Sequence, residues 1–372
     1  MEASLNQKLA SVEWGEYRVG DLFDIVNTLS FNKERLTAGD EYDYVTRTSL
    51  NQGILQSTGF VNEANLNEAN VWSLGLLQMD FFYRKRMWYA GQFVRKIIPK
   101  FDTTVNNAKF FSVMLNKLKP VLLQVLVRNV DETFRSQALY LPTKNNQIDF
   151  DFMESFIAEL EAERIAELSA YLKVSGLDNY ELSAEELKAL QAYHTLEWRE
   201  FNLEKLFGKS TRGKRLKSLD RVKGNLPFVT AGETNTGISA FIGNDVEIFK
   251  SNTTTIDMFG SAKYRNYEYG ADDHIAVVHT DKLNKFASLF VTTAIHRASH
   301  TGKFSYDRNF YAKDADELII SLPVNGTDNI NYEFMALLTQ AIQKLVIKDV
   351  VKYADKRIKA TKTVVKCRQE NR

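Results

Sequence analysis

The sequence EWGEYRVGDLF, residues 13–23, returns in altered form as EWREFNLEKLF at residues 197–207. The two stretches are 184 residues apart, and at the same offset YVTRTSLNQGI (residues 44–54) falls on FVTAGETNTGI (residues 228–238) without a gap. Repeated sequence in the same order predicts repeated structure. The chain is therefore expected to fold as two similar domains, each of which opens with a Glu-Trp pair.

A third match marks the end of each copy. LPTKNNQIDFDFM (residues 141–153) aligns with LPVNGTDNINYEFM (residues 322–335) once a single residue is inserted. Each copy thus runs from a Glu-Trp start to a Leu-Pro finish, and 372 residues leave room for two domains with their connections. We expect a first domain over residues 1–150, a first spacer helix with its linker over 151–196, a second domain over 197–330 and a second spacer helix over 331–372.

Each copy combines strand patterns with a helical pattern. Aromatic and β-branched runs such as MDFFY (residues 79–83) and HIAVV (residues 274–278) are bounded by Gly, Asn and Asp, as strands are. KFFSVMLNKLK (residues 109–119) and KFASLFVTTAI (residues 285–295) carry apolar residues at helical spacing, and Pro120 is expected to end or kink the first. These patterns predict an α+β fold for both domains.

A long amphipathic helix is expected after each Leu-Pro finish. Residues 151–196 carry a net charge of −7 and residues 331–372 a net charge of +6. Each helix has an apolar face, and the two helices carry opposite net charge. We therefore expect them to pair, although each could instead pack on its own domain. Gly176 provides a stop for the first helix. The residues expected in the seam are Phe156, Leu160, Leu168, Leu338, Ile342 and Leu345.

Composition indicates an ordinary globular protein without a membrane span. Hydrophobic residues make up 44% and charged residues 26% of the chain, and no run approaches the roughly 18 apolar residues of a spanning helix. The N-terminal residues lack the basic and apolar regions of a secretory signal. Cys367 is the single cysteine, so no intrachain disulfide can form, and a reducing cytoplasm is the expected location.

No cofactor-binding or metal-binding motif is complete in the sequence. A methyltransferase would need a glycine-rich cofactor turn, whereas the chain has neither a G-x-G nor a Pro-Pro pair. The GKS at residues 208–210 ends like a phosphate-binding loop, but Leu203 stands where the first glycine of that loop is required. His296 and His300 have the spacing of zinc ligands without the glutamate or cysteine that a zinc site needs, so we assign no metal.

The best carboxylate–carboxylate–lysine group for a nuclease is Asp178, Glu186 and Lys188. Ser183 stands at capping-box spacing from Glu186, which predicts a helix here, whereas a nuclease core places such groups on strands. We interpret the three residues as the surface of a helix and assign no catalytic residue.

Two basic clusters suggest a polyanionic partner. Residues 205–223 hold eight basic residues against Asp220 alone, and residues 84–100 hold six with no acid. Such clusters suit the phosphates of DNA, and the hydroxyl- and amide-rich loops 46–53 and 230–237 suit base edges. Solvated charged loops are the alternative. The candidate DNA-binding residues are Arg47, Thr48, Asn51, Arg84, Lys85, Arg86, Lys209, Arg212, Lys214, Arg215, Asn235, Thr236, Lys263 and Arg265.

The order of these features resembles the specificity (S) subunit of type I restriction–modification systems and of the related type IIB systems. The resemblance rests on two Glu-Trp-to-Leu-Pro domains, a long helix after each, and Gly260-Ser261-Ala262-x-Tyr264 before an apolar strand. In the first copy, residues 84–89 depart from that turn. The resemblance implies two target-recognition domains that are separated by an antiparallel coiled coil and read a two-part sequence in double-stranded DNA.

The resemblance also implies partner subunits and no catalysis in this chain. Modification (methyltransferase) subunits would use S-adenosylmethionine, and type I systems would add ATP- and Mg-dependent restriction (translocase/endonuclease) subunits, so no cofactor is expected in the chain itself. If residues 151–174 are helical, they span about 36 Å, which is about one turn of B-DNA. Two alternatives remain open: a self-sufficient DNA-modifying enzyme with unrecognised motifs, and a non-catalytic scaffold or adaptor.

Overall fold

The chain forms two compact units in a computed structural model. The first unit comprises Met1–Ala170 with Lys356–Arg372, and the second comprises Tyr171–Asp355, so both long helices contribute residues to each unit. The structure describes residues 2–125, 127–326 and 329–370.

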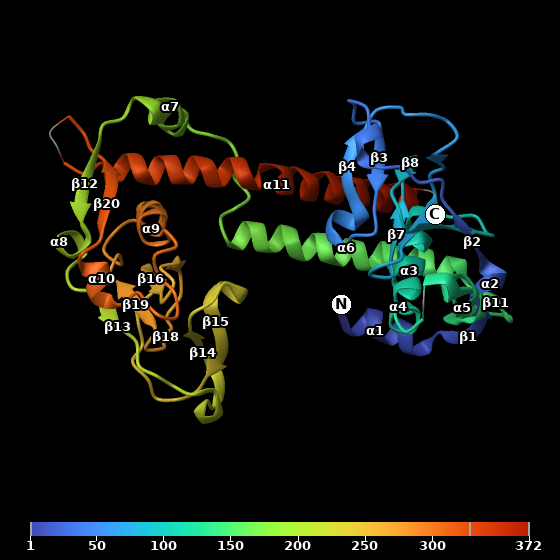
Figure 1. The fold of residues 1–372 in the computed structure, drawn as a ribbon, viewed down its shortest axis with the longest axis horizontal. Helices are drawn as coiled ribbons and strands as arrows, with labels where there is room; N and C mark the ends of the chain where they lie inside the picture. Colours follow the sequence, from blue (N-terminus) through green and yellow to red (C-terminus); the bar gives the residue numbers. More distant parts are fainter. Residues whose placement is uncertain (1, 126, 327–328, 371–372) are drawn as a thin grey trace. The chain divides into compact units, whose positions relative to one another are not determined.

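The first unit is built from short strands with helices around them (Figure 1). Its strands are β1 (Glu13–Arg18), β2 (Phe23–Asn27), β3 (Tyr42–Val45), β4 (Ile54–Thr58), β5 (Leu66–Asn67), β6 (Val71–Gly75), β7 (Asp80–Arg84), β8 (Trp88–Ala90), β9 (Val94–Pro99), β10 (Ala138–Lys144) and β11 (Gln147–Ile148). Its helices are α1 (Glu2–Ser11), α2 (Val19–Leu22), α3 (Val105–Asn116), α4 (Lys119–Leu122), α5 (Val130–Ser136) and most of α6 (Phe150–Val174), with the short turns η1 (Lys33–Arg35), η2 (Leu50–Gly53) and η3 (Val127–Asn129).

The second unit repeats this plan. Its strands are β12 (Trp198–Asn202), β13 (Thr211–Arg212), β14 (Lys223–Val229), β15 (Ile238–Ile242), β16 (Thr253–Asp257), β17 (Ala262–Arg265), β18 (Gly270–Ala271), β19 (Ile275–Val278) and β20 (Ile319–Pro323). Its helices are α7 (Ala184–Ala192), α8 (Leu203–Phe207), α9 (Lys285–Ser299), α10 (Ala312–Asp316) and most of α11 (Tyr332–Glu370), with the short turns η4 (Tyr193–Thr195), η5 (Ser218–Asp220) and η6 (Thr234–Gly237).

The sheet topology confirms that the repeat is structural. One sheet has the strand order β2-β9-β6-β7 in the first unit and β13-β19-β16-β17 in the second. Another has the order β4-β3-β8-β5 in the first unit and β15-β14-β18 in the second, with β3–β8 and β14–β18 as the parallel pairs. The same chain order therefore folds twice into the same α+β arrangement.

The start and finish of each copy are neighbouring strands. In the antiparallel pair β1–β10, Trp14 lies opposite Pro142, and in the pair β12–β20, Trp198 lies opposite Pro323. The Glu-Trp start and the Leu-Pro finish recur together because they are the two strands that close each unit.

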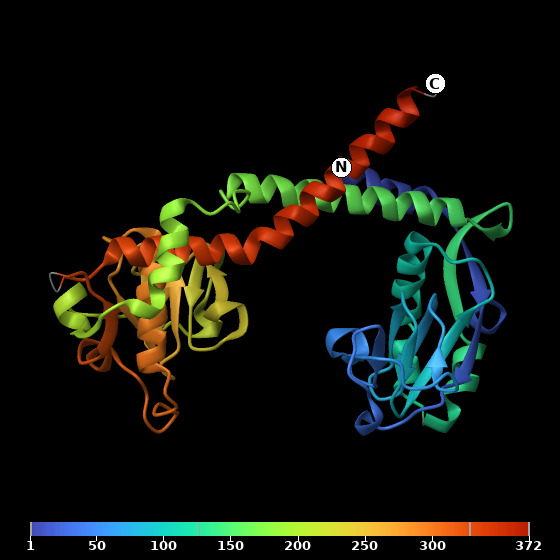
Figure 2. The same cartoon turned by 90° about the horizontal axis from the view of Figure 1, so that it is seen from above.

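One helix covers the central sheet in each unit (Figures 1 and 2). The helix α3 packs against β7, and α9 packs against β17. The hydroxyl of Thr104 caps α3 by accepting the amide of Asn107 at 3.1 Å, and α3 ends at Asn116, before Pro120, as predicted. Beneath α3, the ring of Phe23 contacts Trp72 and Phe111 edge-on.

The first long helix, α6, ends as the sequence predicts. Gly176 has a φ of 65°, and its backbone amide donates to the carbonyl of Lys173 at 3.1 Å. The amide of Leu177 reaches back to the carbonyl of Leu172 at 2.8 Å. This is the bond pattern of a glycine-terminated helix, and it satisfies carbonyls that would otherwise lack a partner.

The seam residues of α6 divide between core and surface. Phe156 is buried in the core of the first unit, Leu160 packs against that core, and Leu168 is half-buried. The alternative of packing on its own domain therefore holds for the beginning of α6. In the same unit, Arg357 of α11 pairs with Glu161 of α6 at 2.6 Å.

The expected seam residues of α11 also divide between core and surface. Leu338 is buried as expected, whereas Ile342 and Leu345 are 48% and 45% exposed. The buried face instead includes Lys344, whose Nζ donates to Glu186 Oε2 at 2.9 Å and to the carbonyl of Glu181 at 2.9 Å. Lys344 thus shares the buried face of α11 with Leu338 and Ala341.

The same ion pair corrects the interpretation of Glu186 as helix surface. Glu186 is buried, and its carboxylate accepts the backbone amide of Ser183 at 2.7 Å as well as the Lys344 ammonium. The hydroxyl of Ser183 accepts the amide of Glu186 at 3.2 Å, which confirms the predicted capping box. Glu186 thus helps to cap the beginning of α7 and joins this helix to α11.

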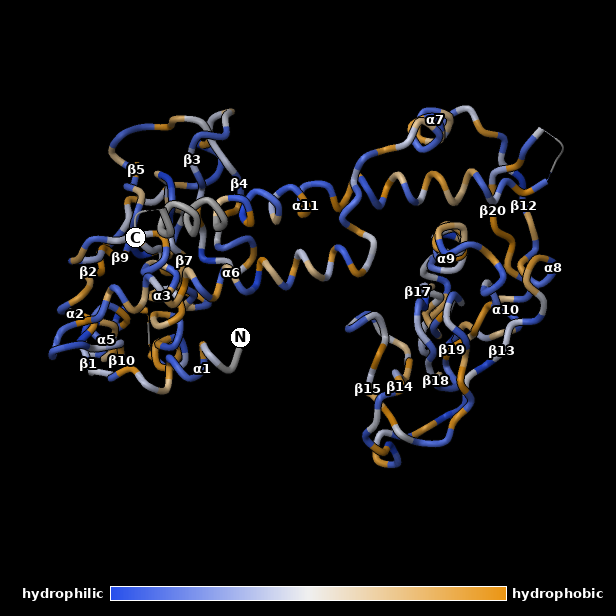
Figure 3. Tube along the Cα trace, turned by 180° about the vertical axis from the view of Figure 1, so that it is seen from behind, coloured by the Kyte–Doolittle hydropathy of each residue, from blue (hydrophilic) through white to orange (hydrophobic). Residues whose placement is uncertain are grey.

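Hydrophobic and hydrophilic residues alternate along α6 and α11 (Figure 3). In the part of the chain that the structure describes, no helix combines the length and the apolar character needed to cross a membrane.

Candidate nucleic-acid interface

One unusual turn is built in the same way in both units, between β3 and β4 and between β14 and β15. Residues 51–53 have φ angles of 47°, 54° and 78°, and residues 235–237 have φ angles of 48°, 54° and 84°. The left-handed region costs a non-glycine residue about 1 kcal/mol or more. Two such residues in succession, in both copies, indicate a backbone held for a purpose, because strain of this kind gathers at functional sites.

The glycine that ends each turn closes it against the preceding strand. The amide of Thr46 donates to the carbonyl of Gly53 at 2.8 Å, and the amide of Thr230 donates to the carbonyl of Gly237 at 2.8 Å. A Cβ on Gly237 would lie 2.8 Å from the carbonyl oxygen of Thr230, so a side chain does not fit there. The repeated Asn-x-Gly of the sequence is thus required by the turn.

Arg84 supports the turn from inside the first unit. Its guanidinium donates to the carbonyl of Gln52 in the turn and, at 2.9 Å, to the hydroxyl of Ser73. The side chain is 2% exposed, which contradicts the expectation that Arg84 contacts DNA directly. Burial lowers the pKa of Arg84 to about 10, so the guanidinium is still charged at neutral pH.

Arg265 takes the same place in the second unit and requires the same correction. It is 1% exposed, and its Nε donates to the hydroxyl of Thr255 at 2.9 Å. Its guanidinium lies beside the turn, with Nη2 3.6 Å from the position of a Cβ on Gly237. Arg84 is the last residue of β7 and Arg265 the last residue of β17, and each donates to a hydroxyl on the preceding strand, β6 or β16. Both guanidinium groups lie under the turn. We therefore assign them to positioning the turn.

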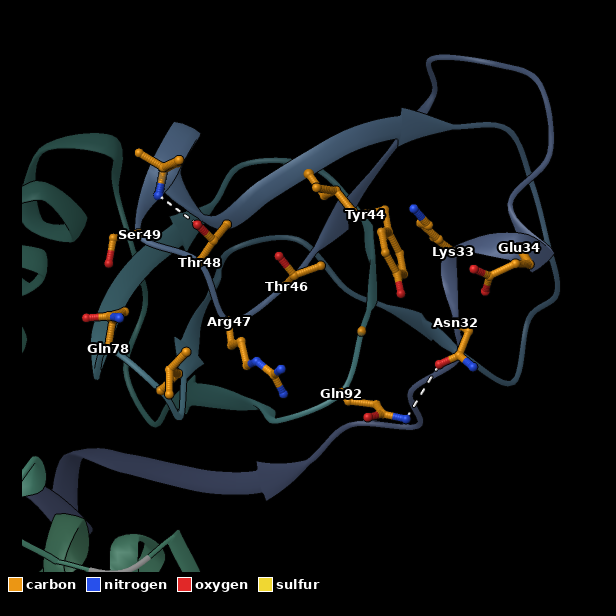
Figure 4. A pocket seen from close by; sticks show the side chains of 14 residues that line it. Asn32, Lys33, Glu34, Tyr44, Thr46, Arg47, Thr48, Ser49, Gln78 and Gln92 are labelled. Carbon is orange, nitrogen blue, oxygen red and sulfur yellow. Dashed lines mark hydrogen bonds between the residues drawn. The ribbon is translucent and has the colours of Figure 1, made fainter. Parts of the chain in front are cut away.

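A cavity of about 710 Å³ opens beside the turn of the first unit (Figure 4). In Figure 4 the side chains of Thr46 and Arg47 point toward its middle, and that of Gln92 points toward Asn32. Four separate segments of the unit contribute to its wall. The lining residues are Asn32, Lys33, Glu34, Tyr44, Thr46, Arg47, Thr48, Ser49, Leu50, Leu55, Leu77, Gln78, Gly91 and Gln92.

The wall of this cavity is rich in groups that recognise base edges. Among the described residues no carboxylate pairs with Arg47, whose guanidinium lies 5.1 Å from the centre of the Phe93 ring. Gln92 donates to Asn32 at 3.5 Å, and outside the wall, in the neighbouring turn, exposed Asn51 donates to a backbone carbonyl at 3.2 Å. Arginine suits guanine and side-chain amides suit adenine in the major groove, so the wall offers both kinds of contact.

The second unit has a smaller cavity with other side chains around the same turn. Its volume is about 560 Å³. Arg47, Thr48 and Ser49 of the first copy correspond to residues 231–233, which are Ala, Gly and Glu. Equal backbones thus present unequal side chains. The lining residues are Asn235, Thr236, Ile238, Ser239, Ala240 and Phe241.

Lys263 is tied down within the protein, which argues against the expected DNA contact. Its side chain is 13% exposed, and its Nζ lies 3.1 Å from Glu233 and 3.4 Å from Asp257. It also donates to the hydroxyl of Ser261 at 2.9 Å. Ser261 and then Lys263 hold the pKa of Glu233 below its ordinary value. This lysine balances the acids beneath the second turn.

Two further candidates are exposed but already paired. Arg86 binds Asp43, which raises the pKa of the arginine. Arg212 donates to the carbonyl of Asp273 and lies 5.3 Å from the centre of the Tyr311 ring. Each would have to share its guanidinium with a phosphate.

The remaining basic candidates are free to meet an anion. Lys214 lies 3.7 Å from Glu247 but keeps 81% of its side chain exposed. Lys85, Lys209 and Arg215 are exposed, and no ion pair joins them to another described residue. These four residues are the best placed of the predicted set to contact phosphates.

The histidine pair has a structural role. The rings of His296 and His300 stack with centroids 4.8 Å apart, and Nδ1 of His296 accepts the backbone amide of Ala262 at 3.1 Å. The pair therefore holds the Gly-Ser-Ala turn. Among the described residues, residues 272–274 form a group of two aspartates and a histidine whose ligand atoms lie within 4.8 Å of one another, but exposed groups of this kind also occur without a metal.

Sequence reasoning missed part of the cavity wall. Asn32, Gln78 and Gln92 come from three different loops and meet Arg47 only in the folded unit. Each lies in a connection between two strands. The sequence can indicate such a loop, but it does not show which loops meet in the folded unit. The prediction found the turn because the turn repeats, and it missed these residues because they do not.

The comparisons with known proteins match the whole arrangement. The family described as type I restriction modification DNA specificity domain matches residues 11–170 and again residues 195–353. A curated relative, the type II restriction enzyme BgcI specificity subunit S.BcgI of Heyndrickxia coagulans, is 24% identical over 344 residues, which are 90% of this chain and 96% of the relative.

A solved structure shows the same fold. The S subunit of a type I restriction–modification system from M. genitalium superposes with a TM-score of 0.58 at 14% identity, over 95% of this chain and 94% of that one. Two family domains, each with the repeated turn, account for nearly all of the sequence. The chain belongs to the family of type I restriction–modification DNA specificity domains and is the specificity subunit of a restriction–modification system.

Proposed function

We propose that each unit reads one half of a bipartite, asymmetric site in double-stranded DNA. The observation that carries the proposal is the left-handed turn, which has the same backbone in both units but different side chains around it. Recognition of base edges requires such polar side chains on a fixed backbone, and exposed lysines and arginines supply the sequence-independent contacts with phosphates. Unlike side chains on like backbones read unlike half-sites.

The spacing of the half-sites follows from the long helices, which we infer to pair as an antiparallel coiled coil. The helix α6 has 25 residues and is about 37 Å long at 1.5 Å per residue. One turn of B-DNA is about 34 to 36 Å, which suits two half-sites read from one side of the duplex. The Arg357–Glu161 ion pair in the first unit supports contact between the end of α11 and α6.

The chain has no catalytic role in this proposal. Modification subunits that use S-adenosylmethionine methylate the site, and ATP-dependent restriction subunits join them in a type I system, while the specificity subunit itself binds no cofactor. Apolar side chains exposed along α11 offer these subunits a docking face. They are Ile342, Leu345, Val346, Val350 and Tyr353.

The test is the binding of the complex with its modification subunits to a library of duplexes. We expect a two-part preferred sequence with an unspecified spacer. A complex that binds no duplex in a salt-dependent manner would point to a scaffold protein. Methylation by the isolated chain would instead show a self-sufficient enzyme.

A further inference from the structure

The loop between β13 and β14 is braced at its tip, η5. From one side, the amide of Asn244 donates to the carbonyl of Asp220 at 2.9 Å, and its Oδ1 accepts the backbone amide of Val222 at 2.7 Å. From the other, Nε and Nη2 of Arg221 donate to the carbonyl of Leu216 at 3.3 and 3.2 Å. A loop held by these bonds keeps one shape in solution.

Arg221 also joins this loop to the surface of the second cavity. Its Nη1 donates to the hydroxyl of Ser239 at 3.1 Å, and its guanidinium lies 5.0 Å from the centre of the Phe228 ring. Ser239 lines the cavity together with residues 235 and 236 of the turn. The loop and the turn therefore share one continuous face of the second unit.

Leu219 stands at the tip of the loop and is 96% exposed, more than any other large hydrophobic side chain that the structure describes. The bonds that fix the loop hold this leucine in water. Exposed lysines and arginines surround it in the sequence, and Asp220 is the one acid between residues 205 and 223. In Figure 3 this loop lies below β14 and mixes hydrophobic with hydrophilic residues.

We propose that Leu219 is a wedge that enters the DNA between two stacked base pairs. This role rests on the proposed function: besides the reading of base edges, the second unit would distort the duplex at the point where Leu219 enters. The surrounding cations bind phosphates on either side, and the leucine then replaces part of the lost stacking with apolar contact. A protein partner is the alternative, but it would have to match the leucine with a strongly acidic rim.

The corresponding loop of the first unit has no leucine at its tip, so the proposed distortion is confined to one half-site. Its turn η1 has the same bonding, since the amide of Arg35 donates to the carbonyl of Asn32 at 3.1 Å and the amide of Asp220 donates to the carbonyl of Lys217 at 3.0 Å. The residue in the place of Leu219 is Glu34. A carboxylate cannot enter a base stack, so only the half-site of the second unit is distorted. That half-site is expected to contain a pyrimidine–purine step, which unstacks most easily.

The test uses the complete complex with modification subunits and a duplex of its preferred sequence. The fluorescent base 2-aminopurine replaces one adenine at a time, because its emission rises when it loses its stacking partner. We expect wild type to raise the emission at one step of the second half-site. Leu219→Ala removes this rise and weakens binding about 10-fold, as expected when the apolar surface of one leucine stays in water. Leu219→Met, which keeps an apolar chain of similar length, retains both.

Leu29→Ala is the matched control, because Leu29 is a 64% exposed leucine of the first unit. It leaves the emission and the affinity unchanged. Sequence-specific binding by wild type without any rise in emission would overturn the wedge while leaving the proposed function intact. A loss of subunit assembly in Leu219→Ala, with emission unchanged, would show a protein contact instead. A wild-type complex that does not discriminate between duplexes refutes the proposed function itself.

Discussion

Replacement of Arg84 by methionine tests the support of the first turn. The substitution keeps an unbranched chain of similar volume but removes the two hydrogen bonds from the guanidinium to Gln52 and Ser73. A hydrogen bond from a charged donor contributes about 1.5–3 kcal/mol, and part of this is returned because a buried charge no longer has to be desolvated. A net loss of about 2 kcal/mol at the turn is therefore expected.

That loss is comparable with the strain that the turn stores. Two non-glycine residues in the left-handed region cost about 2 kcal/mol or more together, so without Arg84 the relaxed backbone becomes as favourable as the strained one. About half of the molecules then keep the binding-competent turn, so we expect binding of the preferred duplex to weaken about 2-fold, with relaxed selectivity at the first half-site only. Arg84→Lys keeps the charge without the fork and should fall between methionine and wild type.

The assay is selection from a library of duplexes by the complex, combined with the midpoint of thermal unfolding. Reduced selectivity at the second half-site as well would mean that the variant acts by unfolding the subunit. Full selectivity at both half-sites would refute the role of Arg84 in positioning the turn. Arg265→Met is the reciprocal experiment, and it should relax the second half-site alone.

Three further predictions concern stability and salt dependence. Lys344→Met leaves the carboxylate of Glu186 buried without its ion-pair partner, so the unfolding free energy of the second unit should fall by about 3 kcal/mol in denaturant titrations, and an unchanged midpoint would refute the pairing. The pKa of His296 lies below its ordinary 6.5, mainly because the ring is partly buried. The native state therefore favours the neutral ring, and the unfolding free energy should decline as pH falls below 6.5. His296→Gln should flatten that decline, and an identical pH profile would contradict it. The double variant Lys209→Ala with Arg215→Ala should weaken binding to all duplexes alike and reduce the salt slope by about 2, whereas a change confined to one sequence would show that these residues read bases.

Local and repeated features could be predicted from the sequence. The duplication, the strands that start and finish each unit, the Gly176 stop and the Ser183–Glu186 capping box all depend on residues close together or on the comparison of one copy with the other. These features are fixed by short-range chemistry, so the pattern of the chain is enough to find them.

Features that depend on distant partners could not be predicted. Arg84 stands in a run of basic residues that is typical of a surface, and its burial is made possible by the carbonyl of Gln52 and the hydroxyl of Ser73, which lie elsewhere in the sequence. Lys344 occupies the packed face of α11 because Glu186, far away in the sequence, neutralises it. The spacing of apolar residues predicted Leu345 on that face. This spacing carries no information about a distant carboxylate such as Glu186, so it could not predict the burial of Lys344.

The central claim, two units that read two half-sites, is tested most directly by sequencing the methylated bases of a genome after co-expression with the modification subunits. The experiment compares wild type with a chimera whose residues 197–330 come from another member of the family. The account predicts a bipartite methylated motif in which the chimera changes one half and keeps the other. A motif that changes in both halves, or one without two parts, would contradict it.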